Sequence, residues 1–79
     1  MSDFRISISS PPDRNYLVTE ILVDGEQWAE LNQEAGDLVL EIYPRRDKQP
    51  WRITYDAAIE ALTLAKKRLV GESQIEQPN

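Results

Sequence analysis

The residues of this chain that could carry out chemistry are few, and the types on which most enzymes depend are missing. The sequence contains no His and no Cys. A serine nucleophile needs a base within reach, but no histidine is present to activate any of the serines. A zinc site would have to consist of carboxylates alone, which is unusual for zinc. The sequence therefore predicts a protein that is not an enzyme and that holds no metal or cofactor.

Only one pair of carboxylates, Glu30 and Glu41, has a spacing that suggests proximity. Paired carboxylates perform acid–base chemistry when burial makes one of them retain its proton. We expect this pair on an open sheet face, where both side chains are solvated, and interpret them as surface acids. The three glycines are isolated and suit turns or a helix end, so the sequence has no glycine-rich phosphate loop.

Charge is unevenly distributed along the chain. Residues 15–43 contain seven acids and no Lys or Arg, whereas residues 44–68 contain seven bases and three acids. The net charge of −5 disfavours general binding to nucleic acid, because that binding needs clustered bases. The loop at 44–52 is the exception, since its bases lie beside Trp51 and suit carboxylate or phosphate recognition. Those bases are Arg45, Arg46, Lys48 and Arg52.

Four segments have the composition and period of β-strands. They are residues 4–8, 16–23, 27–33 and 38–43. Asp24-Gly25 and Ala35-Gly36 are turn signals between the later strands. Residues 51–53 form either a short fifth strand or an extended entry to the helix.

From Asp56 onward, apolar residues recur at helical spacing. They are Ala58, Ile59, Leu62, Ala65, Leu69 and Val70. Thr54 or Asp56 can cap the start, and Gly71 is the expected stop. The sequence thus predicts an α+β fold, an antiparallel β-meander of four or five strands with one C-terminal α-helix packed on one face. Residues 1–71 are expected to form a single domain, and 72–79 a flexible polar tail.

Strand parity divides the sheet into two faces. The face expected to meet the helix carries Leu17, Ile21, Val23, Ala29, Leu31, Leu38, Leu40 and Ile42. A two-residue loop at Ala35-Gly36 sets Leu31 opposite Leu40, Glu30 opposite Glu41 and Trp28 opposite Tyr43. In the first hairpin, a strict two-residue turn pairs Ile21 with Trp28, on the helix side. We expect instead a three-residue loop with a bulge, which keeps Trp28 on the outer face.

The outer face mixes aromatic and acidic residues, a composition typical of interaction surfaces. With the first bases of the adjoining loop, it gives the predicted partner-binding residues: Tyr16, Val18, Glu20, Leu22, Trp28, Glu30, Glu41, Tyr43, Arg45 and Arg46. The alternative interpretation is that these side chains simply suit exposed strands.

The sequence therefore predicts a small, non-enzymatic protein-binding module. Its layout and acidity are shared by many small adaptor, antitoxin and immunity proteins, an analogy of architecture only, and an acidic inhibitor, antitoxin or immunity-like protein is the form of module that the analogy favours. A homodimer formed by the outer face or a free strand edge is one alternative, and a nucleic-acid binder using the 45–52 loop is another. No signal peptide or membrane-spanning segment is visible, so a cytoplasmic protein with a protein partner and no membrane contact is expected.

Overall fold

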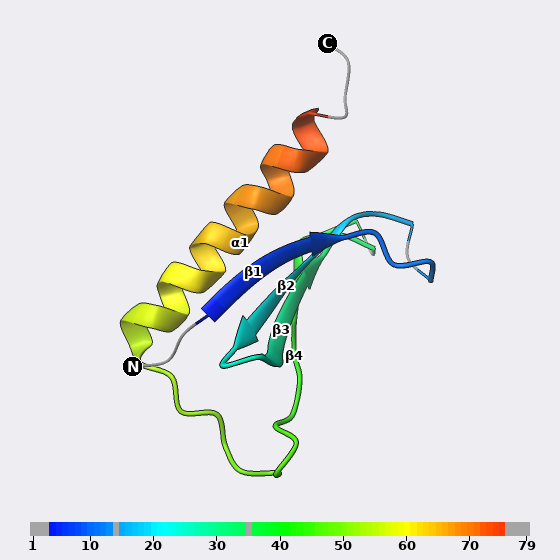
Figure 1. The fold of residues 1–79 in the computed structure, drawn as a ribbon. Helices are drawn as coiled ribbons and strands as arrows, with labels where there is room; N and C mark the ends of the chain where they lie inside the picture. Colours follow the sequence, from blue (N-terminus) through cyan, green and yellow to red (C-terminus); the bar gives the residue numbers. More distant parts are fainter. Residues whose placement is uncertain (1–3, 14, 35, 76–79) are drawn as a thin grey trace.

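The computed structural model describes residues 4–13, 15–34 and 36–75, which form one antiparallel sheet and one helix (Figure 1). The elements are β1 (Phe4–Ser9), β2 (Val18–Val23), β3 (Glu26–Asn32), β4 (Val39–Ile42) and α1 (Tyr55–Ile75). The strands lie in the order β1-β2-β3-β4. The predicted α+β meander with a C-terminal helix is confirmed. Residues 51–53 form no strand and lead into the helix.

The β2–β3 hairpin turns through Asp24 and Gly25, which both have positive φ, at 52° and 83°. Two consecutive positive φ values are typical of the two-residue type I′ turn, whose twist matches that of the strands. The pairing shifts between Ile21 and Leu22, so that Ile21 lies opposite Ala29. The predicted bulge is therefore confirmed, but the predicted three-residue loop is wrong, because the extra residue lies within β3.

The β3–β4 register agrees with the predicted one. Glu30 lies opposite Glu41 and Leu31 opposite Leu40. The ladder continues one step beyond β4, where the backbone N–H of Tyr43 donates to the carbonyl of Trp28 at 2.8 Å. Glu20 on β2 is also the partner of Glu30, so Glu20, Glu30 and Glu41 form a row of three acids across the sheet.

Helix α1 begins at a threonine cap and continues past the expected stop. The hydroxyl of Thr54 accepts a hydrogen bond from the N–H of Ala57 at 3.2 Å, and its carbonyl accepts one from Ala58 at 3.0 Å. The prediction that the helix ends at Gly71 is wrong, since the helix runs to Ile75. Gly71 does not have a positive φ, so nothing in its backbone stops the helix. Part of the predicted 72–79 tail is thus helical, and 76–79 lie outside the described residues.

The core lies between α1 and the face of the sheet that carries Ile21. Its buried members are Ile21, Val23, Trp28, Ala29, Leu31, Ala61, Ala65 and Leu69. Trp51 packs against this cluster and donates its indole N–H to the carbonyl of Tyr43 at 2.8 Å, which fixes the end of the core. Ile59, which the helical spacing placed in the core, is exposed, and Ala61 is buried instead.

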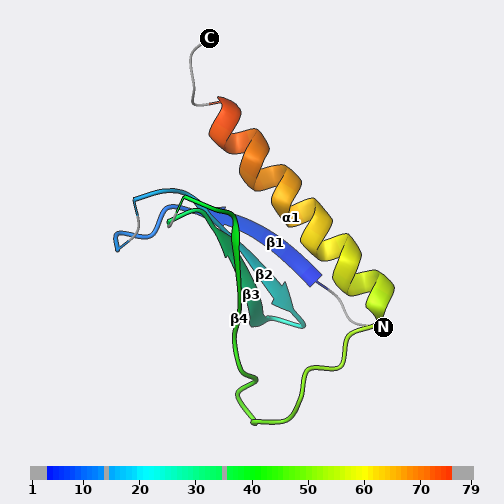
Figure 2. The same ribbon diagram turned by 180° about the vertical axis from the view of Figure 1, so that it is seen from behind.

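The helix covers only part of the sheet. It packs on β1 and β2 and touches β3, whereas β4 forms the edge of the sheet that is farthest from the helix (Figure 2). The prediction that Leu38, Leu40 and Ile42 lie under the helix is therefore wrong. Their side chains are 38%, 42% and 58% exposed. The cause is size, because four strands about 4.8 Å apart make a sheet wider than one helix of about 10 Å diameter.

Candidate interaction surfaces

The structure separates the ten predicted partner-binding residues by exposure. Buried are Val18, Trp28 and Glu30. Half-buried are Glu20, Leu22, Tyr43 and Arg45, and exposed are Tyr16, Glu41 and Arg46. The expectation that Val18, Trp28 and Glu30 lie exposed on an outer face is therefore wrong. Trp28 packs within the hydrophobic core cluster, so its ring is not offered to a partner.

The acidic side chains of β3 and β4 form a hydrogen-bonded network. The side-chain amide of Asn32 donates to Glu30 Oε2 at 3.0 Å and also to Glu41 Oε2. The hydroxyl of Tyr43 donates to the other oxygen of Glu30 at 3.1 Å. Glu30 and Asn32 are only 5% and 3% exposed. Buried carboxylates that accept such bonds hold strands together, so this network reads as structural.

The basic loop after β4 is tied to the rest of the domain. Arg45 forms a salt bridge with Asp47 at 2.9 Å and lies 5.8 Å from the centre of the Trp51 ring. The N–H of Arg46 donates to a carboxylate oxygen of Glu26 at 2.6 Å, which holds the chain beside the start of β3. The positive charge of Arg45 thus interacts with Asp47 and Trp51 of the same loop. Arg46, Lys48 and Arg52 are exposed.

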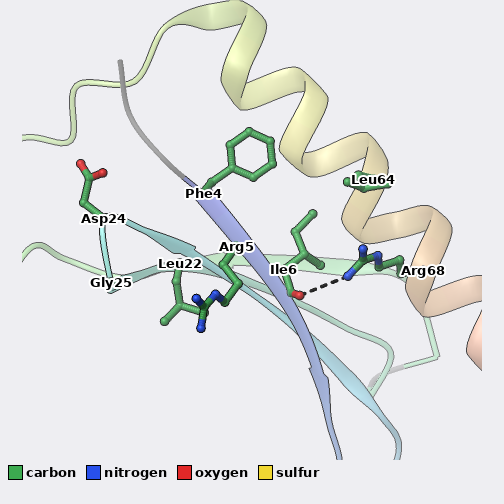
Figure 3. A pocket seen from close by; sticks show the side chains of 8 residues that line it. All are labelled: Phe4, Arg5, Ile6, Leu22, Asp24, Gly25, Leu64 and Arg68. Carbon is green, nitrogen blue, oxygen red and sulfur yellow. Dashed lines mark hydrogen bonds between the residues drawn. The ribbon is translucent and has the colours of Figure 1, made fainter.

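A hollow of about 690 Å³ lies where β1 passes the helix (Figure 3). Phe4 and Ile6 line it on the helix side, whereas Arg5 and Leu22 line it on the other side of β1. The hollow therefore wraps around the edge of a strand and is not an enclosed cavity. At this edge Arg68 Nη1 donates to the carbonyl oxygen of Ile6 at 3.2 Å, so the helix protects the free side of β1.

The opposite edge of the sheet, β4, has no such cover among the described residues. Leu40 and Ile42 share a face with Leu31 and Ala29, their partners on β3, which are buried in the core. The apolar surface of the core thus continues past the helix onto an open edge. We call this surface the β4 edge; its side chains are Leu38, Leu40 and Ile42. The sequence did not predict this exposed surface, because strand parity shows which face of the sheet a residue lies on but not how much of that face the helix covers.

Comparison with protein families, with curated proteins and with solved structures finds no match to this chain. Within the described residues, no group of three or more acids, histidines or cysteines is arranged to hold a metal ion. No helix in this part of the chain combines the length and the apolar character that crossing a membrane requires.

Proposed function

We propose that this protein is a non-enzymatic binding module that acts through contacts with a protein, and that the β4 edge is its contact surface. One observation carries the proposal. Leu38, just before β4, and Leu40 and Ile42, on β4 itself, are exposed in a row along one edge of the sheet. Isolated exposed apolar residues are ordinary, but a contiguous apolar strip on an open strand edge favours strand addition.

The contrast between the two sheet edges supports this reading. At β1, the guanidinium of Arg68 donates a hydrogen bond to the backbone carbonyl of Ile6, and α1 lies alongside the strand. Proteins commonly protect an edge strand with a covering element or a charged side chain. At β4 the single charged residue is Glu41, which belongs to the face opposite Leu40 and Ile42. One edge is therefore protected, and the described residues leave the other open.

The charge of the chain suggests where and with what such a module acts. The acidic stretch at 15–43 favours encounter with a basic surface, which either another protein or the 44–68 stretch of a second copy offers, and the rate of that encounter falls as salt rises. A chain with no cysteine is compatible with a reducing compartment, and we place the protein in the cytoplasm on that ground.

Site-specific photo-cross-linking in the source cell tests the proposal. The photoreactive residue p-benzoylphenylalanine is placed at position 40 in one variant and at position 63 in a control. Both Leu40 and Thr63 are exposed, and Thr63 lies on α1. An adduct of defined mass that forms from position 40 but not from position 63 supports the proposal. Equal labelling from both positions, or none from position 40, overturns it.

A further inference from the structure

We infer that the β4 edge binds the β4 edge of a second copy of this chain, with the two strands antiparallel about a two-fold axis. The inference rests on the proposed function, and it names the partner. The backbone, the side chains and the flanking charges of the β4 segment each fit this arrangement.

The hydrogen-bond pattern shows which backbone groups of β4 are open. The N–H of Tyr43 donates to the carbonyl of Trp28 on β3, so the backbone N–H of Tyr43 points toward β3. Antiparallel strands alternate between residues that bond to a given neighbour and residues that face away from it. Val39 and Glu41 therefore bond to β3, whereas Leu40 and Ile42 direct their N–H and C=O groups to the open edge. None of the described residues forms a hydrogen bond with these outward-pointing backbone groups.

Two-fold symmetry restricts how two copies of this strand can pair. Residue 40 of one copy can lie opposite residue 40 of the other, and both copies then offer outward-facing backbone groups at that point. Leu38 then lies opposite Ile42 of the second copy, which makes an apolar row on one face. Glu41 lies opposite Val39 of the second copy, so no acid faces another acid.

The neighbouring register, centred on residue 41, is disfavoured by charge. It sets Glu41 of one copy directly opposite Glu41 of the other. Like charges at opposed positions destabilise a strand pair. The side chains of β4 therefore favour the register centred on Leu40 over the one centred on Glu41.

The segments that flank β4 have opposite charges, and the two-fold axis brings them together. Asp37 precedes the strand and is exposed, whereas Arg46 follows it and is exposed. In an antiparallel pair, the start of one strand lies beside the end of the other. The acidic segment of each copy thus lies beside the basic segment of its partner. This arrangement gives a role to the change of sign near Tyr43 that the sequence shows.

Helix α1 leaves room for the pairing. It lies over β1 and β2, near the edge of the sheet opposite to β4 (Figures 1 and 2). The helices of the two copies therefore stay apart when the β4 strands pair. A contact made by one short strand and its flanks is smaller than the roughly 1,600 Å² of a typical stable complex. We therefore expect a dimer that forms and dissociates with protein concentration.

Single cysteines test both the dimer and its register, because the chain contains none of its own. The variants are Leu40→Cys, Glu41→Cys and Ile42→Cys, with Thr63→Cys as the control for random collision. All four positions are exposed. Opposed residues in a bonded antiparallel pair have Cα atoms about 5.5 Å apart, within the range of a disulfide. In the proposed register, the two copies of residue 42 are about 13 Å apart, too far for a disulfide.

Each protein is oxidised under the same mild conditions, and the covalent dimer is followed by mass spectrometry. We expect Leu40→Cys to cross-link about tenfold faster than Ile42→Cys and Thr63→Cys, because only its Cα atoms lie within disulfide range. Faster cross-linking of Glu41→Cys overturns the register. Equal, slow cross-linking of all four variants overturns the dimer.

Light scattering across a concentration series separates failure of this inference from failure of the proposed function. The parent protein should change from monomer to dimer as concentration rises, and Leu40→Lys should raise the dissociation constant about tenfold or more by burying a charge at the contact. Because Leu40 is 42% exposed in the monomer, we expect the variant to fold, and its far-UV circular dichroism checks this. A parent protein that stays monomeric overturns the inference. A photo-adduct at position 40 with a different protein then leaves the proposed function standing.

Discussion

Replacing Thr19 with valine should stabilise this protein, although most substitutions of buried residues destabilise. Thr19 is fully buried, and no described residue forms a hydrogen bond with its Oγ1. Its partners on the neighbouring strands are Ile8 and Leu31, which are both apolar. A hydroxyl buried without a partner costs about 1–3 kcal/mol. Valine keeps the branched shape that suits β2 and replaces this hydroxyl with a methyl group.

We expect the free energy of unfolding to rise by about 1 kcal/mol, the low end of that range, because the pocket adjusts to the new methyl group. For a domain of this size, such a gain raises the melting temperature by about 4–8 °C. Urea unfolding followed by tryptophan fluorescence gives the free energy, and calorimetry gives the temperature. Thr63→Val is the matched control, since Thr63 is exposed on α1 and should change stability by less than about 0.5 kcal/mol. If Thr19→Val lowers the melting temperature, the hydroxyl makes a bond that stabilises the fold, and the reasoning is refuted.

The polar contacts give two further predictions, both measured by urea unfolding. Asn32→Leu removes two hydrogen bonds to the carboxylates of Glu30 and Glu41 and should lower the free energy of unfolding by about 2 kcal/mol; a loss below about 0.5 kcal/mol would show that the amide does not stabilise the fold. Trp51→Phe keeps an aromatic ring but removes the N–H that donates to the carbonyl of Tyr43, so a loss of about 1 kcal/mol is expected. A Trp51→Phe variant as stable as the parent would contradict the role given to that bond.

The strand pairing was accessible to sequence reasoning because local rules determine it. The register that sets Glu30 opposite Glu41 follows from turn signals and the two-residue period of strands, and the structure confirms it. The cap at Thr54 also follows from local chemistry, since its hydroxyl accepts the N–H of Ala57. The position of the bulge was only partly predictable, because either a longer loop or an extra residue in β3 removes the Ile21–Trp28 pairing.

The extent of the cover over the sheet was not accessible in the same way. Leu40 and Ile42 alternate like core residues, and only the placement of α1 over β1 and β2 leaves them exposed. The burial of Glu30 was missed for a related reason. Its hydrogen bonds come from Asn32, on the same strand, and from Tyr43, whose side chain meets Glu30 only once β3 and β4 are paired. Helix length was misjudged because Gly71 does not have the left-handed backbone that marks a helix stop.

Amide hydrogen exchange, measured residue by residue by NMR, tests the central claim most directly. The claim is that β4 pairs along its open edge with another strand. In dilute protein, the amides of Leu40 and Ile42 should exchange quickly, and those of Glu41 and Tyr43 slowly, because only the latter two bond to β3. As protein concentration rises, the exchange of Leu40 and Ile42 should slow while that of Glu41 changes little. If Leu40 and Ile42 exchange equally fast at every concentration while the protein still self-associates, the β4 edge is not the contact surface.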